Sequence, residues 1–363
     1  MNRKLISNVP LITMSADNMA YMTSFTGALY GALKSIGENF DNSQLLAYSS
    51  FGNRFCWTDK KWVFGNEYFE NCNEVPFENQ KRLLKAIGWK VKMISLLRDE
   101  NGNLLNTNEE QIRQDFVDSI NKGIPVLAQG ITNDGCKHDY DVFFGYEDDG
   151  EKVIGWDYYQ NDDKLLIRDN WEQEVNAYVL LTEKTQSKSE KECIIEAFKI
   201  ITTQSRKNEI RGRKMGFAAW ESLLTQLEHD DFSKCSLHPS EDLSNVNNEA
   251  NSLEHRFIIY CDALSQIFQR SIILDYYRTL IEKFPEWAVE LRIAIDAWDE
   301  CAKYGGFLWS QGFSFDEAGY EKFRNQNARK ILVDEGRKAM AKDIEAIEQI
   351  EKILCKEDLN IDK

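Results

Sequence analysis

The hydrophobic pattern of this chain changes near the polar stretch TEKTQSKSEK, residues 182–191. Before this stretch, short strand-like apolar runs are mixed with helical ones, and after it nearly every apolar run follows a helical period. A change of this kind at a charged, polar stretch marks a domain boundary. Because 363 residues exceed what most single cores contain, we predict an α+β domain over residues 1–184 and an all-α helical domain over residues 185–363.

The clearest element of the first domain is an amphipathic helix that ends at Gly37. Its apolar stripe recurs at helical spacing and consists of Phe25, Ala28, Leu29, Ala32, Leu33 and Ile36. The elements predicted next are a helix over 79–88, a strand over 89–97 and a helix around 112–120 capped by Thr107 or Asn108.

A group of strand-like segments completes the first domain. They span residues 124–131, 140–146, 152–159, 164–169 and 177–181. The turn residues Asp148, Asp149 and Gly150 separate two of them, so VFFGYEDDGEKVIGW is predicted to form a hairpin. Helices followed by an antiparallel sheet give the α+β pattern.

The second domain is predicted to be helical throughout. Amphipathic periods cover residues 189–204, 214–228, 251–270, 271–283, 286–303 and 316–356. The polar segment HPSEDLSNVNNEANS, residues 238–252, is the obvious long loop between them. A helical bundle or array follows from this pattern, since no exact repeat marks a solenoid.

Composition narrows the classes of partner. With 60 acidic and 44 basic residues the net charge is −16, which would repel a phosphate backbone, so no nucleic-acid partner is expected. The start of the chain has no signal-like apolar region and no later run is long enough to span a membrane, so we expect a cytoplasmic protein without a membrane partner. Eight scattered cysteines without a CxxC pair predict reduced thiols, no metal site and no cofactor.

Several segments together resemble a known family. The order of a central helix, smaller helices, GIPVLAQG at 123–130 and VFFGYEDDGEKVIGWDYYQ at 142–160 is similar to the papain-like fold in its bacterial peptide-processing form. That form includes the bacteriocin-leader peptidases and the N-terminal domain of butirosin-type acyltransferases. With FGNRFCW at 51–57, the chain also resembles bacterial proteins that join such a domain to a helical C-terminal one. The resemblance implies an α+β papain-like cysteine-peptidase-type domain followed by an all-α helical domain.

The resemblance implies a nucleophile at the start of the central helix. Papain-like enzymes place a cysteine there because the helix N-terminus lowers the thiol pKa and stabilises an oxyanion. Counted back from Gly37, the family's Asp-Cys pair falls on Thr23 and Ser24, so a serine occupies the nucleophile position. A serine hydroxyl needs a strong base to become a nucleophile. Both residues are alternatively favoured helix N-caps.

The resemblance also assigns the other members of a catalytic set. Family spacing puts the base at Asp139, with His138 one residue away, and alternation along a strand would then turn His138 to the other face unless a bulge intervenes. Asp157 matches the residue that orients an imidazole, or else caps a strand-end turn. Asn18 matches an oxyanion donor, or else follows Asp17 in a turn.

Further residues remain as alternatives. Cys136 forms a Cys-x-His pair with His138 and is an alternative nucleophile, although two ligands alone do not make a zinc site. Trp57 and Trp156, with the hydroxyl of Thr23, are candidates to line a pocket, and packing of these aromatic rings in a core is the competing interpretation.

Two functions therefore follow from the sequence. The first is a non-catalytic relative of papain-like peptidases and acyltransferases, whose cleft binds a peptide, a small metabolite or the acyl group of an acyl-carrier protein. The alternative is an active amide hydrolase or acyltransferase of bacterial secondary metabolism, which uses Ser24 or Cys136, His138, Asp157 and Asn18. The absence of the expected cysteine favours the first function. The oligomeric state is left open.

Overall fold

The computed structural model describes residues 2–14, 23–66, 73–75, 77–99, 104–133, 137–159, 164–239 and 249–361. The chain divides into two compact units. The α+β unit combines Met1–Leu46 with Asn79–Ser189, and the helical unit combines Ala47–Glu78 with Glu190–Lys363. The α+β class of the first part and the helical character of the C-terminal part confirm the coarse prediction.

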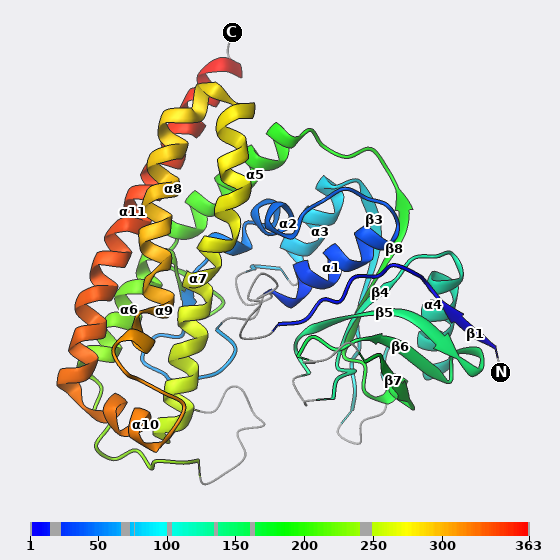
Figure 1. Ribbon diagram of the computed structural model, residues 1–363, viewed down its shortest axis with the longest axis horizontal. Helices are drawn as coiled ribbons and strands as arrows, with labels where there is room; N and C mark the ends of the chain where they lie inside the picture. The colour runs from blue at the N-terminus through cyan, green and yellow to red at the C-terminus, as the bar shows by residue number, and fades with distance from the viewer. Residues whose placement is uncertain are drawn as a thin grey trace. The chain divides into compact units, whose positions relative to one another are not determined.

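An antiparallel sheet forms the centre of the α+β unit (Figure 1). Its strands in the described part of the chain are β1 (Arg3–Leu5), β3 (Trp89–Ser95), β4 (Val126–Gln129), β5 (Tyr140–Glu147), β6 (Lys152–Trp156), β7 (Leu166–Asp169) and β8 (Ala177–Lys184). They are ordered β3-β8-β4-β5-β6-β7, with β1 paired to β5. The predicted hairpin is present as β5 and β6, whose turn places Asp148, Asp149 and Gly150 at positive φ. The hydrophobic pattern of the sequence did not predict β1, because all three residues of this strand are exposed.

Helices cover both faces of this sheet. They are α1 (Ser24–Ser35) and α4 (Glu109–Asn121), which pack on β4 and β5. The other helices of this part of the chain are α2 (Asn42–Ser49), which ends in the helical unit, and α3 (Glu78–Ala86). Phe25 of α1 packs on Tyr140 with 5.1 Å between ring centroids, whereas Phe116 of α4 lies 6.1 Å from Phe143. Because residues three apart on a strand point to opposite faces, α1 and α4 lie on opposite sides of β5. Asn108 caps α4, accepting a 2.8 Å hydrogen bond from the Gln111 backbone N–H.

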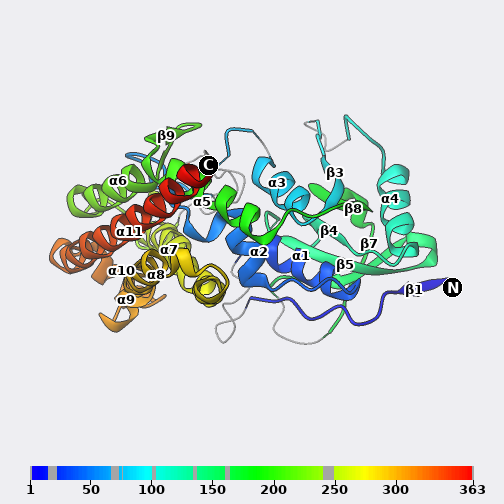
Figure 2. The same ribbon diagram turned by 90° about the horizontal axis from the view of Figure 1, so that it is seen from above.

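The helical unit is built mainly from long helices, of which α7, α8 and α11 run side by side (Figures 1 and 2). Its described helices are α5 (Glu190–Arg206), α6 (Gly216–His229), α7 (Leu253–Lys283), α8 (Ala288–Ala302), α9 (Tyr304–Ser310), α10 (Glu317–Arg324) and α11 (Gln326–Ile361).

Two predicted helix boundaries are wrong. The helices predicted over 251–270 and 271–283 form the single helix α7, since no Gly or Pro interrupts the sequence there. The helix predicted over 316–356 is divided at Asn325. Asn325 leaves the helical conformation, and its side-chain oxygen accepts hydrogen bonds from the N–H groups of Asn327 and Ala328.

A segment from the first half of the chain belongs to the helical unit. Residues 47–78, which the sequence-based division assigned to the first domain, contribute β2 (Cys56–Trp57) to a small sheet with β10 (Arg213–Met215) and β9 (Glu209–Ile210). Trp57 and Trp62 enter the helical core, where both are fully buried. Their hydrogen-bond partners, Gln226 and Asp230, lie far along the sequence, so the local hydrophobic period does not predict these contacts.

A single carboxylate joins the helices of this unit. Asp343 of α11 accepts two hydrogen bonds from Arg270 of α7, from Nε at 2.9 Å and from Nη2 at 2.7 Å. The indole N–H of Trp220 in α6 and that of Trp298 in α8 also donate to it, at 2.9 and 3.0 Å. All four side chains are buried. Four donors on one buried carboxylate offset the cost of removing the charges from water.

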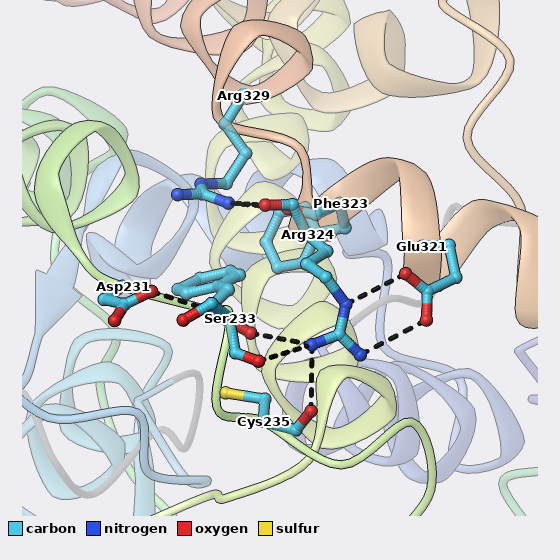
Figure 3. A network of polar contacts seen from close by, with 8 residues as sticks. Asp231, Ser233, Cys235, Glu321, Phe323, Arg324 and Arg329 are labelled. Carbon is cyan, nitrogen blue, oxygen red and sulfur yellow. Dashed lines mark hydrogen bonds and ion pairs between the residues drawn. The ribbon is translucent and has the colours of Figure 1, made fainter.

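Two arginines secure the ends of α6 and α10 (Figure 3). Arg329, which is 1 % exposed, donates to the backbone carbonyls of Leu227, Asp230 and Phe323. Arg324 donates through Nη1 to three carbonyls of the loop after α6, those of Phe232, Ser233 and Cys235. Cationic donors thereby satisfy carbonyls that helix ends and loops leave without partners.

Among the described residues, one helix, α7, has the length and apolar composition that a membrane crossing requires. Its most apolar window is 61 % buried inside the protein. It also carries Arg270, whose charge is paired within the core. This burial is typical of the core helix of a bundle.

Replacement of Asp343 by Asn tests this interpretation of the helical core. The variant removes the negative charge but leaves the buried Arg270 guanidinium, so we expect a loss of about 3–5 kcal/mol in the free energy of unfolding by urea. Asp334→Asn, an exposed position on the same helix, is the matched control and should leave that free energy unchanged. Equal stability of the two variants would contradict the proposed role of Asp343.

Candidate functional site

Three elements of the α+β unit meet at one end of its sheet. Antiparallel pairing places the start of β5 beside the end of β6, with Val142 opposite Trp156. The ring contact between Phe25 and Tyr140 places the first turn of α1 at the same end. The segments that carry Thr23, Ser24, His138, Asp139 and Asp157 therefore converge there, and we call these five residues the α1 site.

The start of α1 offers hydroxyl groups in a buried setting. Thr23 occupies the N-cap position, as its residue type predicts, but its side chain makes no capping hydrogen bond. Its Oγ1 is buried and has no hydrogen-bond partner among the residues that the structure describes, and Thr23 is 6 % exposed. Ser24 is 8 % exposed and opens the helix. The positive end of the helix dipole and two buried hydroxyls thus occupy the position where the resemblance implies a thiol.

His138 and Asp139 precede β5 rather than lie within it. The strand begins at Tyr140, and the two residues before it form a turn and a bend. The predicted alternation of faces therefore does not apply to them, because it holds only for extended strand residues. Side-chain amides hold this segment: Gln129 donates to the His138 carbonyl at 2.6 Å, and Asn176 donates to the Lys137 carbonyl at 3.1 Å.

The imidazole of His138 has a pKa below its ordinary value of 6.5. Although the side chain is exposed, surrounding chain atoms displace water and disfavour the charged ring, and the nearby carboxylate of Asp139 opposes this effect. Since the lowering dominates, the ring is neutral at pH 7 and offers one nitrogen as a hydrogen-bond or proton acceptor.

The carboxylate of Asp157 anchors two turns. It accepts hydrogen bonds from the Asn133 N–H at 2.6 Å and the Thr132 hydroxyl at 3.2 Å on Oδ2, and from the Tyr159 N–H at 3.1 Å on Oδ1. The side chain is 1 % exposed. These three donors occupy most of the about four acceptor positions of a carboxylate. The strand-end capping role that the sequence allowed is therefore present.

A second buried acid stands beside it. Asp141, in β5, is 3 % exposed and accepts a 2.7 Å hydrogen bond from the Tyr158 N–H. The sequence pattern predicted only that Asp141 lies in a strand. The sequence signal for this contact is an acidic residue inside the apolar run YDVFFGY, because a carboxylate is rarely buried without a specific hydrogen-bond partner.

Two further candidates, Trp156 and Trp57, belong to different units. Trp156 donates its indole N–H to the Val9 carbonyl at 3.2 Å and packs on Phe144. Trp57 lies in the helical unit, fully buried, with its indole N–H on Gln226. Asn18 and Cys136 fall outside the described residues. In the part of the chain that the structure describes, no three His, Cys, Asp or Glu side chains are placed to hold a metal ion.

No protein-family model matches this chain, and no curated protein sequence matches it either. The chemistry of the α1 site therefore follows from its own geometry. The site combines hydroxyl groups at a helix N-terminus, a neutral imidazole on a tethered segment and two buried carboxylates that hold backbone N–H groups. This arrangement suits the binding of a ligand oxygen at the helix start.

Titration of the histidines by NMR tests the electrostatics of the site. His138 should titrate below 6.5, and Asp139→Asn should lower its pKa further, because the variant removes the carboxylate that favours the charged ring. His238 is the internal control: hydrogen bonds to Glu254 and Glu317 hold its pKa above 6.5. A His138 midpoint at or above 6.5 would contradict this account of the site.

Proposed function

We propose that the α+β unit is a papain-like domain whose α1 site binds an acyl or carboxylate group without cleaving it. The ligand is a peptide, a small metabolite or the acyl group of an acyl-carrier protein. The element order supports this proposal: a buried helix packs on β4 and β5 of an antiparallel sheet and begins where β5 starts and β6 ends.

The observation that carries the proposal is the buried hydroxyl of Thr23 at the N-terminus of α1, which has no hydrogen-bond partner in the described part of the chain. A buried polar group without a hydrogen bond costs free energy, and native structures rarely leave one without a reason. An oxygen of a carbonyl or carboxylate would accept from this hydroxyl and gain from the positive end of the helix dipole. A ligand oxygen would thus supply the hydrogen bond that the described residues do not give the Thr23 hydroxyl.

Binding is favoured over catalysis by the residues that surround the helix start. A serine hydroxyl has a far higher pKa than a thiol, so the helix dipole alone does not activate Ser24. The carboxylate of Asp157, which the resemblance assigns to orient an imidazole, is largely occupied by the turn residues Thr132, Asn133 and Tyr159. The site therefore departs from the family's catalytic set at two positions.

One observation supports the alternative, an acyl-transfer enzyme with Ser24 as nucleophile. His138 is neutral at pH 7 because its pKa is lowered, so its ring is able to take the proton that a serine nucleophile must lose. In this alternative, the Ser24 oxygen bonds to the acyl carbonyl carbon while His138 takes the hydroxyl proton, and His138 returns this proton to the amine or thiol that leaves as its bond to that carbon breaks. Water or an acceptor amine then attacks the serine ester and restores the Ser24 hydroxyl.

A cytoplasmic location is part of the proposal. It fits the free thiols of Cys235 and Cys301, which are buried in the helical unit. The net charge of −16 argues against a nucleic-acid partner.

Ligand binding at the α1 site is testable by NMR titration with N-acetylglycylglycine and with butyryl-pantetheine. We expect one of them to shift the backbone amide signals of Ser24 to Gly27. Thr23→Val removes a hydroxyl that has no partner among the described residues, so it should keep or raise the melting temperature and yet weaken binding about tenfold.

Thr26→Val is the matched control, because the Thr26 hydroxyl already donates to the Thr23 carbonyl at 3.2 Å within the helix. Binding of equal strength in the Thr23 and Thr26 variants would overturn the proposal. Absence of shifts at Ser24 to Gly27 with both ligands would overturn it as well.

A further inference from the structure

The helical unit contains a pocket of about 480 Å³. Its walls come from one face of α6, from the turn before Trp62, from Lys214 of β10 and from Asn208, which precedes β9. The side chains that matter for its chemistry are Asp59, Lys214, Glu221, Ser222, Gln226 and Asp230. A volume of this size is in the range of small-molecule sites.

Buried side chains of the helical core hold polar groups of this pocket in place. The indole N–H of Trp57 donates to Gln226 Oε1 at 2.9 Å, and that of Trp62 donates to Asp230 Oδ2 at 2.6 Å. Arg329 donates to the Asp230 backbone carbonyl at 2.9 Å. Because a rigid core positions these groups, little ordering would remain to oppose ligand binding.

Gln226 presents a donor without an acceptor. The residue lines the pocket and is 5 % exposed, and Trp57 holds its side-chain oxygen. Its Nε2 is buried and has no hydrogen-bond partner in the described part of the chain. An amide donor of this kind at a pocket wall calls for a ligand oxygen, either a hydroxyl or a carbonyl.

The charges around Gln226 favour a cation. Asp59, Glu221 and Asp230 supply three carboxylates, whereas Lys60 and Lys214 supply two ammonium groups. Lys214 is itself paired with Glu209 at 3.4 Å. The Ser222 hydroxyl donates to Asp59 Oδ1 at 2.7 Å, and the Trp62 indole donates to Asp230 Oδ2. Each of these two aspartates thus has one carboxylate oxygen engaged by a side chain of the protein. The other oxygens suit the N–H groups of a ligand ammonium.

We propose that this pocket binds a small primary amine that carries a neighbouring hydroxyl or carbonyl oxygen. The ammonium group lies between Asp59 and Asp230, and the oxygen accepts a hydrogen bond from Gln226 Nε2. This proposal stands on the helical unit alone and does not rest on the function of the α1 site.

The NMR signals of the Trp57 and Trp62 indole N–H groups report binding, because these groups donate to side chains that line the pocket. Glycinamide is the probe, and propylamine, acetamide and acetate are compared with it. In a protein labelled with ¹⁵N at its tryptophan side chains, glycinamide should shift the indole signals of Trp57 and Trp62. The signal of Trp171, which donates to the Gly150 carbonyl in the α+β unit, should not move. Propylamine should bind more weakly because it has no oxygen for Gln226.

Isosteric variants test the assigned contacts. Asp59→Asn and Asp230→Asn keep an acceptor for Ser222 and Trp62 but remove the charge, so each should weaken glycinamide binding about tenfold. Asp231→Asn, at the adjacent exposed position, is the matched control and should not change the affinity. Unmoved Trp57 and Trp62 signals, equal shifts with acetate, or equal affinity in all three variants would each overturn the proposal.

Discussion

The buried carboxylate of Asp343 is the contact on which the helical unit depends. It receives N–H groups from Arg270, Trp220 and Trp298, so it joins α11 to α7, α6 and α8. Arg270 also donates to the Asn53 carbonyl, which ties the segment from the first half of the chain to the same centre. With these helices fixed, the face of α6 that carries Gln226 is fixed as well. The pocket of this unit is thus a consequence of its polar core.

The α+β unit depends on a different constraint, which is strand register. Antiparallel pairing of β5 with β6 brings residues that are distant in sequence to one sheet end, and the packing of Phe25 on Tyr140 adds the start of α1. Papain-like catalysis would need an activated nucleophile at this end. The structure instead has a buried hydroxyl at Thr23 and a carboxylate at Asp157 that holds turns. Both features are more consistent with binding than with turnover.

Local patterns predicted most of the elements but not their partners. The stripe that begins at Phe25 predicted α1, and the alternating runs predicted the sheet, because these periods report which face is buried. Residues 47–78 belong to the helical unit because Trp57 and Trp62 contact residues far along the chain. A local hydrophobic period does not predict such distant contacts. For the same reason, the sequence indicated candidate residues of the α1 site but not the hydrogen bonds of Asp157.

The reactivity of Ser24 toward a fluorophosphonate probe tests the central claim most directly. The native protein, the urea-unfolded protein and the Ser24→Ala variant would be labelled in parallel, and the modified residue mapped by mass spectrometry. If the α1 site binds without catalysis, Ser24 in the native protein is modified no faster than in the unfolded chain. Rapid, selective modification of Ser24 that is lost in a His138→Ala variant would contradict the account and establish an acyl-transfer enzyme.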